Sequence, residues 1–276
     1  PSADHPPITQ APTVSDPAAA CPDTLPAGAP AVRLQSVSKW FDTRGKEPLT
    51  VLQNVSIDVP EQSVVALVGA SGCGKSTILN IMSGLLTPDR GCVFIHGTAA
   101  ADYKAWRSVG YMFQEDRLLP WRTALDNTAF GLEAETLPRR ERNERAMAAL
   151  ELVGLAPFAS AFPHELSGGM RSRVALARSL VTRPTLLLMD EPFSKLDPMI
   201  RSQMHDELLR IKSMMDMTIV FVTHDVEEAV VLADQVVLLM PRPGRVRSVM
   251  PVPLARPRDP NSQVVSDEVR RLRPLI

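Results

Sequence analysis

The chain has few cysteines and no long apolar run. Its three cysteines, Cys21, Cys73 and Cys92, include no CxxC pair, which argues against a disulfide framework and against a zinc knuckle. A reducing compartment is the simpler interpretation. No stretch reaches the roughly 18 consecutive apolar residues of a membrane span, because the longest candidate, residues 229–240, is interrupted by Asp234. We therefore expect neither a disulfide-stabilised secreted domain nor an integral membrane protein.

The chain also lacks an excess of charge of either sign. Thirty Lys and Arg residues against 31 Asp and Glu residues leave a formal net charge of −1. This balance argues against a nucleic-acid partner that is bound through a large basic excess. The first residues show no basic stretch followed by an apolar one, so no signal peptide is expected. Together these absences predict a soluble intracellular protein.

What the chain does contain is enough apolar sequence for one large folded domain. Of its 276 residues, 45% are hydrophobic and 22% are charged, which are ordinary values for a globular protein with a substantial core. Residues 1–30 differ, because they hold eight prolines and seven alanines and almost no large apolar side chain. Such a segment buries too little surface to offset its ordering entropy. We expect a disordered tail over residues 1–30, a folded domain over residues 31–255 and a C-terminal extension over residues 256–276.

From residue 32 onward, short apolar runs alternate with segments of helical pattern. Strands are expected at residues 32–41, 51–59, 63–69, 92–96, 110–113, 185–190, 218–223 and 235–240. Helices are expected at residues 75–85, 139–152, 168–180, 199–214 and 226–233. The connection between the first two strands is too long for a two-residue turn, which leaves their pairing open. Strands alternating with helices predict a largely parallel sheet, into which a helical subdomain is inserted at about residues 115–183.

Residues 69–76 match the pattern G-x-x-x-x-G-K-[ST] and lie between an expected buried strand and an expected helix. Glycines in this pattern let backbone N–H groups surround phosphates at the positive end of a helix. Lys75 should reach the β- and γ-phosphates of a nucleoside triphosphate, and Ser76 should hold Mg²⁺. A glycine turn beside a solvated lysine is the alternative interpretation. The residues expected to bind nucleotide here are Gly69, Ala70, Ser71, Gly72, Cys73, Gly74, Lys75, Ser76 and Thr77.

A second apolar strand ends in two carboxylates, Asp190 and Glu191. The carboxyl end of a strand is where ligands bind in open α/β sheets. Asp190 would order Mg²⁺ through water, and Glu191 would polarise the attacking water. Taken alone, such a pair is more often the capped end of a strand. Its place downstream of Lys75, in a strand of suitable identity, favours the functional interpretation.

A third motif, Leu166–Met170, reads Leu-Ser-Gly-Gly-Met and precedes a helix. Ser167 offers a hydroxyl group, and Gly168 and Gly169 offer bare backbone N–H groups at the helix start, which suits a phosphate. An ordinary serine N-cap followed by flexible glycines is the simpler alternative, and for an isolated motif it would be preferred.

Together the motifs resemble those of the ATP-binding subunits of ABC transporters over about residues 32–250. The matching segments are the Walker A loop at residues 69–76, the Q-loop glutamine Gln114, the signature at 166–170, the Walker B strand at 186–191, the D-loop at 194–197 and the switch histidine His224. The resemblance implies an α/β fold: a P-loop NTPase core with a mostly parallel sheet, an antiparallel β subdomain and a helical subdomain that carries the signature.

The resemblance also implies roles for single residues. Phe41 would stack on adenine, with Trp40 as a neighbouring competitor. Gln114 would contact Mg²⁺ and the attacking water and would link the site to a membrane partner. His224 would hold the γ-phosphate, so that Glu191, His224 and Gln114 form the implied catalytic set.

Other implied roles involve a second copy of the chain. In a head-to-tail dimer with ATP at the interface, Ser167, Gly168, Gly169 and Asp197 would bind nucleotide. The implied cofactors are ATP and Mg²⁺. The implied metal-binding residues are Ser76, Gln114 and Asp190.

Three shorter segments, residues 113–121, 241–246 and 256–259, resemble the importer branch for nitrate, sulfonates and taurine. Ordinary surface loops are the alternative interpretation, and relatives in this branch also carry bicarbonate, cyanate, aromatic acids or pyrimidine precursors. The resemblance implies an ATP-hydrolysing importer subunit, peripheral on the cytoplasmic face of the inner membrane. Its partners would be separate transmembrane permease subunits and, indirectly, a solute-binding protein, with no nucleic acid. A soluble ABC-type ATPase not tied to transport is a further alternative.

Two positions depart from the family pattern. Met170 stands where the signature usually has glutamine, and Lys195 stands at a D-loop position that is usually small. Lys195 would either add a salt bridge at the dimer interface or disturb it. Cys73 lies inside the phosphate loop, so alkylation of its thiol is expected to clash with nucleotide.

Overall fold

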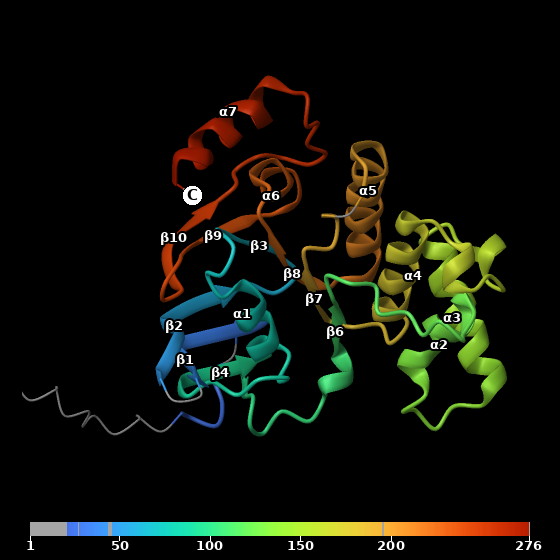
Figure 1. Cartoon of the computed structure of the whole chain (residues 1–276), viewed down its shortest axis with the longest axis horizontal. Coiled ribbons are helices and arrows are strands. Elements are labelled where there is room, and N and C mark those ends of the chain that lie inside the picture. The colour runs from blue at the N-terminus through green and yellow to red at the C-terminus, as the bar shows by residue number, and fades with distance from the viewer. Residues whose placement is uncertain (1–20, 27, 44–45, 195, 276) are drawn as a thin grey trace, which may run out of the picture.

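The computed structural model describes residues 21–26, 28–43, 46–194 and 196–275, which form two sheets with helices around them (Figure 1). The first sheet has four strands in the order β2-β1-β4-β5, and the second has six in the order β10-β9-β3-β8-β7-β6. The predicted α/β class with a mainly parallel sheet and a separate antiparallel unit is confirmed.

The antiparallel sheet is built from β1 (Val32–Thr43), β2 (Lys46–Val59), β4 (Arg90–Ile95) and the short β5 (Thr98–Ala99). The pairing that the sequence left open is antiparallel, and it aligns Val32 with Val59. Side chains alternate between faces along a strand, and a register shift between Leu34 and Val37 resets this alternation in β1. Leu34, Val37 and Ile57 are all buried.

The second sheet carries the strand ends that matter for function. Its strands are β3 (Val64–Gly69), β6 (Val109–Met112), β7 (Leu186–Asp190), β8 (Thr218–Thr223), β9 (Gln235–Met240) and β10 (Arg245–Pro251). Strands β9, β3, β8, β7 and β6 run parallel, and β10 pairs antiparallel with β9. Every residue of β3 and β8 is buried, which explains their continuous apolar sequences, since helices or the other sheet cover both faces of a parallel sheet.

Helices connect these strands in the order that the sequence predicts. Those close to the parallel sheet are α1 (Lys75–Met82), α5 (Pro198–Met215) and α6 (Val226–Leu232). The helices α2 (Ala124–Ala129), α3 (Arg139–Leu152) and α4 (Gly168–Leu180) stand together beside α5, at the right of Figure 1. We call residues 115–183 the helical unit. No helix in the described ranges is long and apolar enough to cross a membrane.

The predicted strands and helices do not include β5, β10 or α7 (Gln263–Leu272), whereas α2 falls within the predicted helical subdomain. Strand β10 alternates between exposed and half-buried residues at the edge of the sheet, so it lacks the apolar run that marks the inner strands. Helix α7 lies within the predicted C-terminal extension and packs on α6 through Val265, Val269 and Leu272.

The N-terminal end of the described chain lies against the antiparallel sheet. The N–H of Leu25 donates to the carbonyl of Gly97 at 2.7 Å, and the N–H of Ala99 donates to Asp23 at 2.9 Å. Cys21 and Cys92 form a disulfide, so the expectation of no disulfide was wrong. The two cysteines are 71 residues apart and meet through chain folding, which no local spacing pattern announces. Most of the predicted tail, residues 1–20, lies outside the described residues.

Candidate active site

The phosphate loop connects the end of β3 to the start of α1. Gly72 and Gly74 have φ values of +78° and +89°, a left-handed conformation that glycine adopts without steric cost. A Cβ atom on Gly74 would lie 2.4 Å from Cδ2 of Leu52, and one on Gly69 would lie 2.7 Å from the carbonyl oxygen of Leu239. The glycine pattern is therefore required by backbone geometry and by close packing of the loop against two strands.

The first turn of α1 is open to an anion. Its N-cap residue, Gly74, provides no side-chain hydrogen bond, and the first turn holds no acidic residue. Its N–H groups and the positive end of the helix dipole therefore favour a phosphate. Lys75 is 7% exposed, and its Nζ donates to the carbonyls of Gly69 at 2.7 Å and Ala70 at 3.1 Å. The ammonium group is thus held within the loop that surrounds the site.

Cys73 lies in this loop, but its side chain points into the core. The residue has no exposed surface, and burial raises the pKa of its thiol. A raised pKa keeps the thiol protonated and unreactive, because the thiolate is the nucleophile. Direct alkylation of the folded protein at Cys73 is accordingly hindered by the packing of the loop itself.

Asp190 closes β7 beside the first turn of α1. Burial raises the pKa of its carboxyl group, and the nearby hydroxyl of Ser76 partly offsets this shift. The hydroxyl and the carboxylate supply oxygen atoms of the kind that Mg²⁺ prefers. The described residues hold no cluster of three or more His, Cys, Asp and Glu side chains suited to a metal ion. A divalent cation would therefore depend on a mixed donor set such as this one.

Glu191 brings the three predicted catalytic residues together. Its Oε2 accepts a hydrogen bond from Nε2 of Gln114 at 3.1 Å, and its Oε1 lies 3.7 Å from Nδ1 of His224. Gln114 follows β6, Glu191 follows β7, and His224 follows β8. These strands are parallel neighbours in the sheet, so their carboxyl ends deliver the three side chains to one edge.

The residues expected to bind adenine lie on the antiparallel sheet. Phe41 is 41% exposed, and Nζ of Lys39 lies 5.5 Å from the centre of its ring. The neighbouring Trp40 has the guanidinium group of Arg90 5.9 Å from its ring centre. Of the two residues, Phe41 has the larger exposed fraction.

The signature motif begins α4. Oγ of Ser167 accepts from the N–H of Met170 at 3.2 Å, which is the N-cap alternative considered from the sequence. Gly168 is exposed in the first turn, and Gly169 is half-buried. A cleft of about 200 Å³ has Gly168 on one side and Gln114 and Glu191 on another. The exposed helix start therefore lines the same small cleft as the carboxylate of Glu191.

Two further positions flank the site. Oδ1 of Asp197 accepts from the N–H of Ile200 at 3.0 Å and caps α5, while Lys195 lies outside the described residues. Asp225, which sequence reasoning did not single out, caps α6 directly after His224 and accepts from the N–H of Glu227 at 2.9 Å. An aspartate followed by acidic residues before an apolar helix is a recognisable N-cap pattern.

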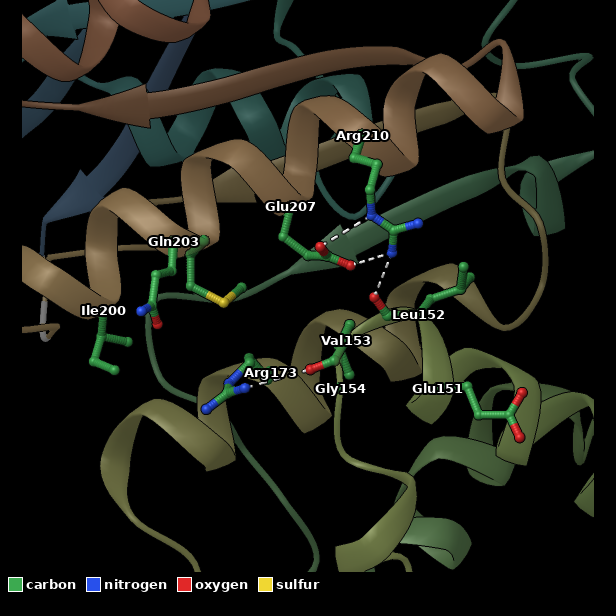
Figure 2. Close-up of a pocket in the computed structure, with 10 residues that line it drawn as sticks. Glu151, Leu152, Val153, Gly154, Arg173, Ile200, Gln203, Glu207 and Arg210 are labelled. Atoms are coloured by element: carbon green, nitrogen blue, oxygen red, sulfur yellow. Dashed lines mark hydrogen bonds and ion pairs between the residues drawn. The ribbon is translucent and has the colours of Figure 1, made fainter. Parts of the chain in front are cut away.

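A larger cleft, of about 330 Å³, lies elsewhere, between α5, the end of α3 and Arg173 of α4 (Figure 2). Figure 2 shows Arg210 of α5 pairing with Glu207 and reaching the end of α3, where it donates to the carbonyl of Leu152 at 3.1 Å. Arg173 of α4 donates to the carbonyl of Val153 at 3.5 Å. This cleft marks the junction between the helical unit and α5, and the predicted catalytic residues are not among its lining residues.

Known proteins resemble the chain over most of its length. The taurine import ATP-binding protein TauB of Rhizobium johnstonii is 46% identical over 215 residues, which cover 78% of this chain and 81% of that protein. The bicarbonate transport ATP-binding protein CmpD of Synechocystis is 39% identical over 229 residues, covering 82% of this chain and 80% of that protein.

A solved structure has the same architecture. The dimeric, post-hydrolysis ATP-binding cassette MJ0796, bound to ADP and Pi, superposes with a TM-score of 0.72 at 31% identity, covering 81% of this chain and all of that one. The family model described as "ABC transporter" matches residues 52–194, which include the phosphate loop, Gln114, the signature motif and both carboxylates. The chain therefore belongs to the ABC transporter family.

Proposed function

We propose that this chain is the ATP-hydrolysing subunit of an importer for a small solute, an anion such as taurine, another sulfonate or nitrate. The observation that carries the proposal is the placement of Glu191 between Gln114 and His224, at 3.1 and 3.7 Å. This arrangement stands at the sheet edge that also carries the phosphate loop. The similarity to TauB, a taurine import protein by name, supports the class of solute.

ATP would bind with its phosphates in the loop of residues 69–77. The N–H groups of the loop and the start of α1 would contact the phosphate oxygens, and Lys75 would neutralise their charge. Phe41 would cover the adenine. Ser76, Asp190 and Gln114 would hold Mg²⁺, which supplies neutralisation of phosphate charge when bound. The effect of the Ser76 hydroxyl on the pKa of Asp190 supports this donor set, because it indicates that the two oxygen donors lie near each other.

Hydrolysis would depend on the orientation of one water molecule. Glu191 would accept its proton or fix its direction, a role that general-base residues fill with rate effects of about 10²–10⁴-fold. Gln114 would orient the carboxylate and the water relative to each other, and His224 would contact the γ-phosphate. Each group would stabilise charge that grows in the transition state, which is the larger part of catalysis in phosphoryl transfer.

A second copy of the chain would complete each site. Ser167, Gly168 and Gly169 present hydroxyl and N–H groups at an exposed helix start, where they would bind the γ-phosphate of ATP held by the other copy. Asp197 would contribute at the same interface. The dimeric state of MJ0796 supports this arrangement. Closing and opening of the dimer would move separate permease subunits at the cytoplasmic face of the membrane, which receive solute from a binding protein.

The solute is the least constrained part of the proposal. Similarity to the bicarbonate transport protein CmpD favours a second candidate, a bicarbonate importer. The solute would be selected by the binding protein and the permease, so the residues of this chain do not discriminate between the two candidates.

One experiment tests the proposal. The chain would be purified with the permease and solute-binding subunits encoded beside it, reconstituted in liposomes, and assayed for ATP hydrolysis with nitrate, taurine, other sulfonates and bicarbonate. We expect stimulation by one of these solutes and a loss of at least about 100-fold in Glu191→Gln, with ATP binding retained. Glu141→Gln, an exposed carboxylate of α3, is the control and should hydrolyse at the wild-type rate. Hydrolysis that no solute changes would contradict the transport role.

A further inference from the structure

The segment that follows Gln114 is held by arginines of α4. Oδ2 of Asp116 accepts a hydrogen bond from Nε of Arg171 at 3.0 Å. Arg178, two turns further along α4, donates to the carbonyl of Asp116 at 2.6 Å and to that of Arg117 at 2.9 Å. The helix therefore contacts this segment through one ion pair and two charged hydrogen bonds to carbonyls.

Arg171 also contacts the signature motif from within its own helix. Its NH1 group donates to the carbonyl of Leu166 at 2.8 Å, and Leu166 immediately precedes Ser167. A single guanidinium group thus bridges a residue two positions after Gln114 and a residue one position before Ser167. The planar fork of arginine suits such a bridge, because its donors have a fixed relative direction.

The bridge leads directly to the catalytic carboxylate. Only one residue separates Gln114 from Asp116, and Gln114 donates to Glu191 at 3.1 Å. The chain after Asp116 is fixed as well, since Arg117 has a left-handed φ of +45° and its guanidinium lies 4.1 Å from the ring centre of Phe113. A displacement of the start of α4 would therefore be transmitted to Gln114 over a short, constrained path.

The two arginines differ in what their loss would do. Burial lowers the pKa of Arg178, and the charge of Asp116 opposes that shift. The hydrogen bonds of Arg178 go to main-chain carbonyls, which is typical of a residue with a structural role. The Asp116 and Arg171 side chains are 31% and 37% exposed, so water screens their ion pair and the pair adds little to overall stability. Its geometry, rather than its strength, is what could matter for hydrolysis.

We propose that Asp116 and Arg171 are positioning residues that couple the signature motif to Gln114. With the pair formed, Gln114 stands against Glu191 only when the start of α4 occupies its observed position. The signature of one copy contacts the other copy's nucleotide in the proposed dimer, so the pair would report dimer closure to its own copy's catalytic carboxylate. This inference rests on the proposed function for its biological meaning, although the coupling itself is testable on ATP hydrolysis alone.

The main competing explanation is that Asp116 only stabilises the local turn in which it lies. Its Oδ1 accepts from the N–H of Leu118 at 3.3 Å. Asp116→Asn separates the two roles, because an asparagine oxygen can still accept from Leu118, while its neutral amide no longer forms an ion pair with Arg171. Arg171→Gln removes the charge from the other side.

The test is a double-mutant cycle on the complete transporter. Asp116→Asn, Arg171→Gln and the double variant would be compared for kcat and KM of ATP hydrolysis, for the ATP dissociation constant, and for Tm. We expect each single variant to lower kcat by roughly 3- to 10-fold and to leave KM and the dissociation constant within about twofold. The double variant should be no slower than the slower single variant, because each single change already breaks the same Asp116–Arg171 contact.

Glu141→Gln and Arg145→Gln form the matched control, because Glu141 and Arg145 form an ion pair within α3 at 2.6 Å. This ion pair involves neither α4 nor Gln114. These control variants should keep the wild-type kcat. Additive losses in the Asp116–Arg171 cycle, a rise in KM with unchanged kcat, or a normal rate in Asp116→Asn would overturn the inference. A wild-type transporter that hydrolyses ATP without response to any solute would contradict the proposed function, yet the same cycle on that basal hydrolysis would still decide the coupling.

Discussion

The phosphate loop and the helical unit are attached to the parallel sheet in different ways. Beneath the loop, the side chains that join it to the core are apolar and closed to water: Cys73, Ile78 and Leu79 have no exposed surface. The helical unit shares buried apolar residues with the sheet as well. At its margins, however, arginines donate to main-chain carbonyls, as Arg210 does to Leu152 and Arg178 to Asp116.

This difference indicates which part of the molecule can move at small cost. A close-packed interior resists displacement, because every shift creates a gap or an overlap. A partly exposed hydrogen bond to a carbonyl can be exchanged for one to water, so its net contribution is only about 0.5–1.5 kcal/mol. The loop is therefore a fixed frame for phosphates, while the helical unit can respond to nucleotide or to a partner.

The largest effect is predicted for a substitution that disrupts the packing of the phosphate loop. Gly74→Ala places a methyl group 2.4 Å from Cδ2 of Leu52, which is fully buried, at a φ of +89°. We expect a loss of about 2–4 kcal/mol in the free energy of unfolding, from overpacking and left-handed strain together, and weak ATP binding. Denaturant unfolding and nucleotide titration measure both quantities.

Gly72→Ala is the matched control for that substitution. Gly72 has a similar φ of +78°, yet a Cβ atom there would meet nothing within 4 Å. We expect only the conformational cost, about 1 kcal/mol. Equal losses in the two variants would mean that backbone strain, and not close packing, determines the glycine pattern of the loop.

The reactivity of Cys73 gives a second measure of the closed frame. Its thiol is buried and its pKa is raised by burial, so alkylation requires local opening of the loop. An opening free energy of about 3 kcal/mol would slow the reaction by roughly 100-fold relative to an open thiol. Iodoacetamide labelling followed by peptide mass spectrometry measures the rate.

The same chain supplies the control, because reduction of the Cys21–Cys92 disulfide exposes further thiols. Cys21 is exposed and should be labelled within minutes at pH 8. Labelling of Cys73 at a comparable rate in the folded protein would contradict a closed loop.

A third, smaller effect concerns Asp190. Burial raises the pKa of its carboxyl group in the folded protein, so the native state binds its proton more tightly than the unfolded chain does. Stability is then lost as pH rises from the ordinary aspartate value through the raised one. Asp190→Asn removes this loss and should raise Tm at pH 7, while Mg²⁺-dependent hydrolysis should fall because the variant removes a carboxylate that is proposed to hold the cation.

The Tm advantage of Asp190→Asn should vanish below about pH 3, where the carboxyl is protonated in both states. Thermal unfolding without nucleotide at pH 7 and at the acidic limit provides the comparison. A variant that is no more stable than the wild type at pH 7 would show that favourable interactions of the carboxylate outweigh the cost of burying its charge.

The sequence predicted the fixed frame well, because its signals are local. The strand before the phosphate loop is a continuous apolar run that ends in a glycine-rich pattern, and the structure has the strand there. The meeting of Gln114, Glu191 and His224 was also expected. The resemblance of the motifs to a known family implied that these three residues meet, and the order of the parallel strands explains physically why they do.

The contacts of the helical unit could not be predicted in the same way. Asp116 and Arg171 are 55 residues apart, and Arg210 and Leu152 are 58 apart. An arginine that will bond a distant carbonyl looks like any other surface charge in the sequence. For the same reason the sequence did not predict the Cys21–Cys92 disulfide. Nor did it predict β10, which forms a strand because it pairs with the edge of the sheet.

The smallest predicted effect tests whether the margin of the helical unit is as weakly held as its contacts imply. Arg210 is half exposed, pairs with Glu207 in its own helix, and joins α5 to α3 only through the carbonyl of Leu152 at 3.1 Å. Arg210→Gln should therefore cost less than about 1 kcal/mol, a shift in Tm of roughly 2–4 °C at most for a chain of this size.

Arg140→Gln, which removes the largely exposed Arg140–Glu144 pair within α3, should produce no measurable change, and the difference between the two variants isolates the junction. A loss of several kcal/mol in Arg210→Gln would mean that the helical unit is bound to α5 as rigidly as the phosphate loop is bound to the sheet. In that case motion at this junction would be too costly to accompany each cycle of hydrolysis, and coupling would have to pass through the Gln114 segment alone.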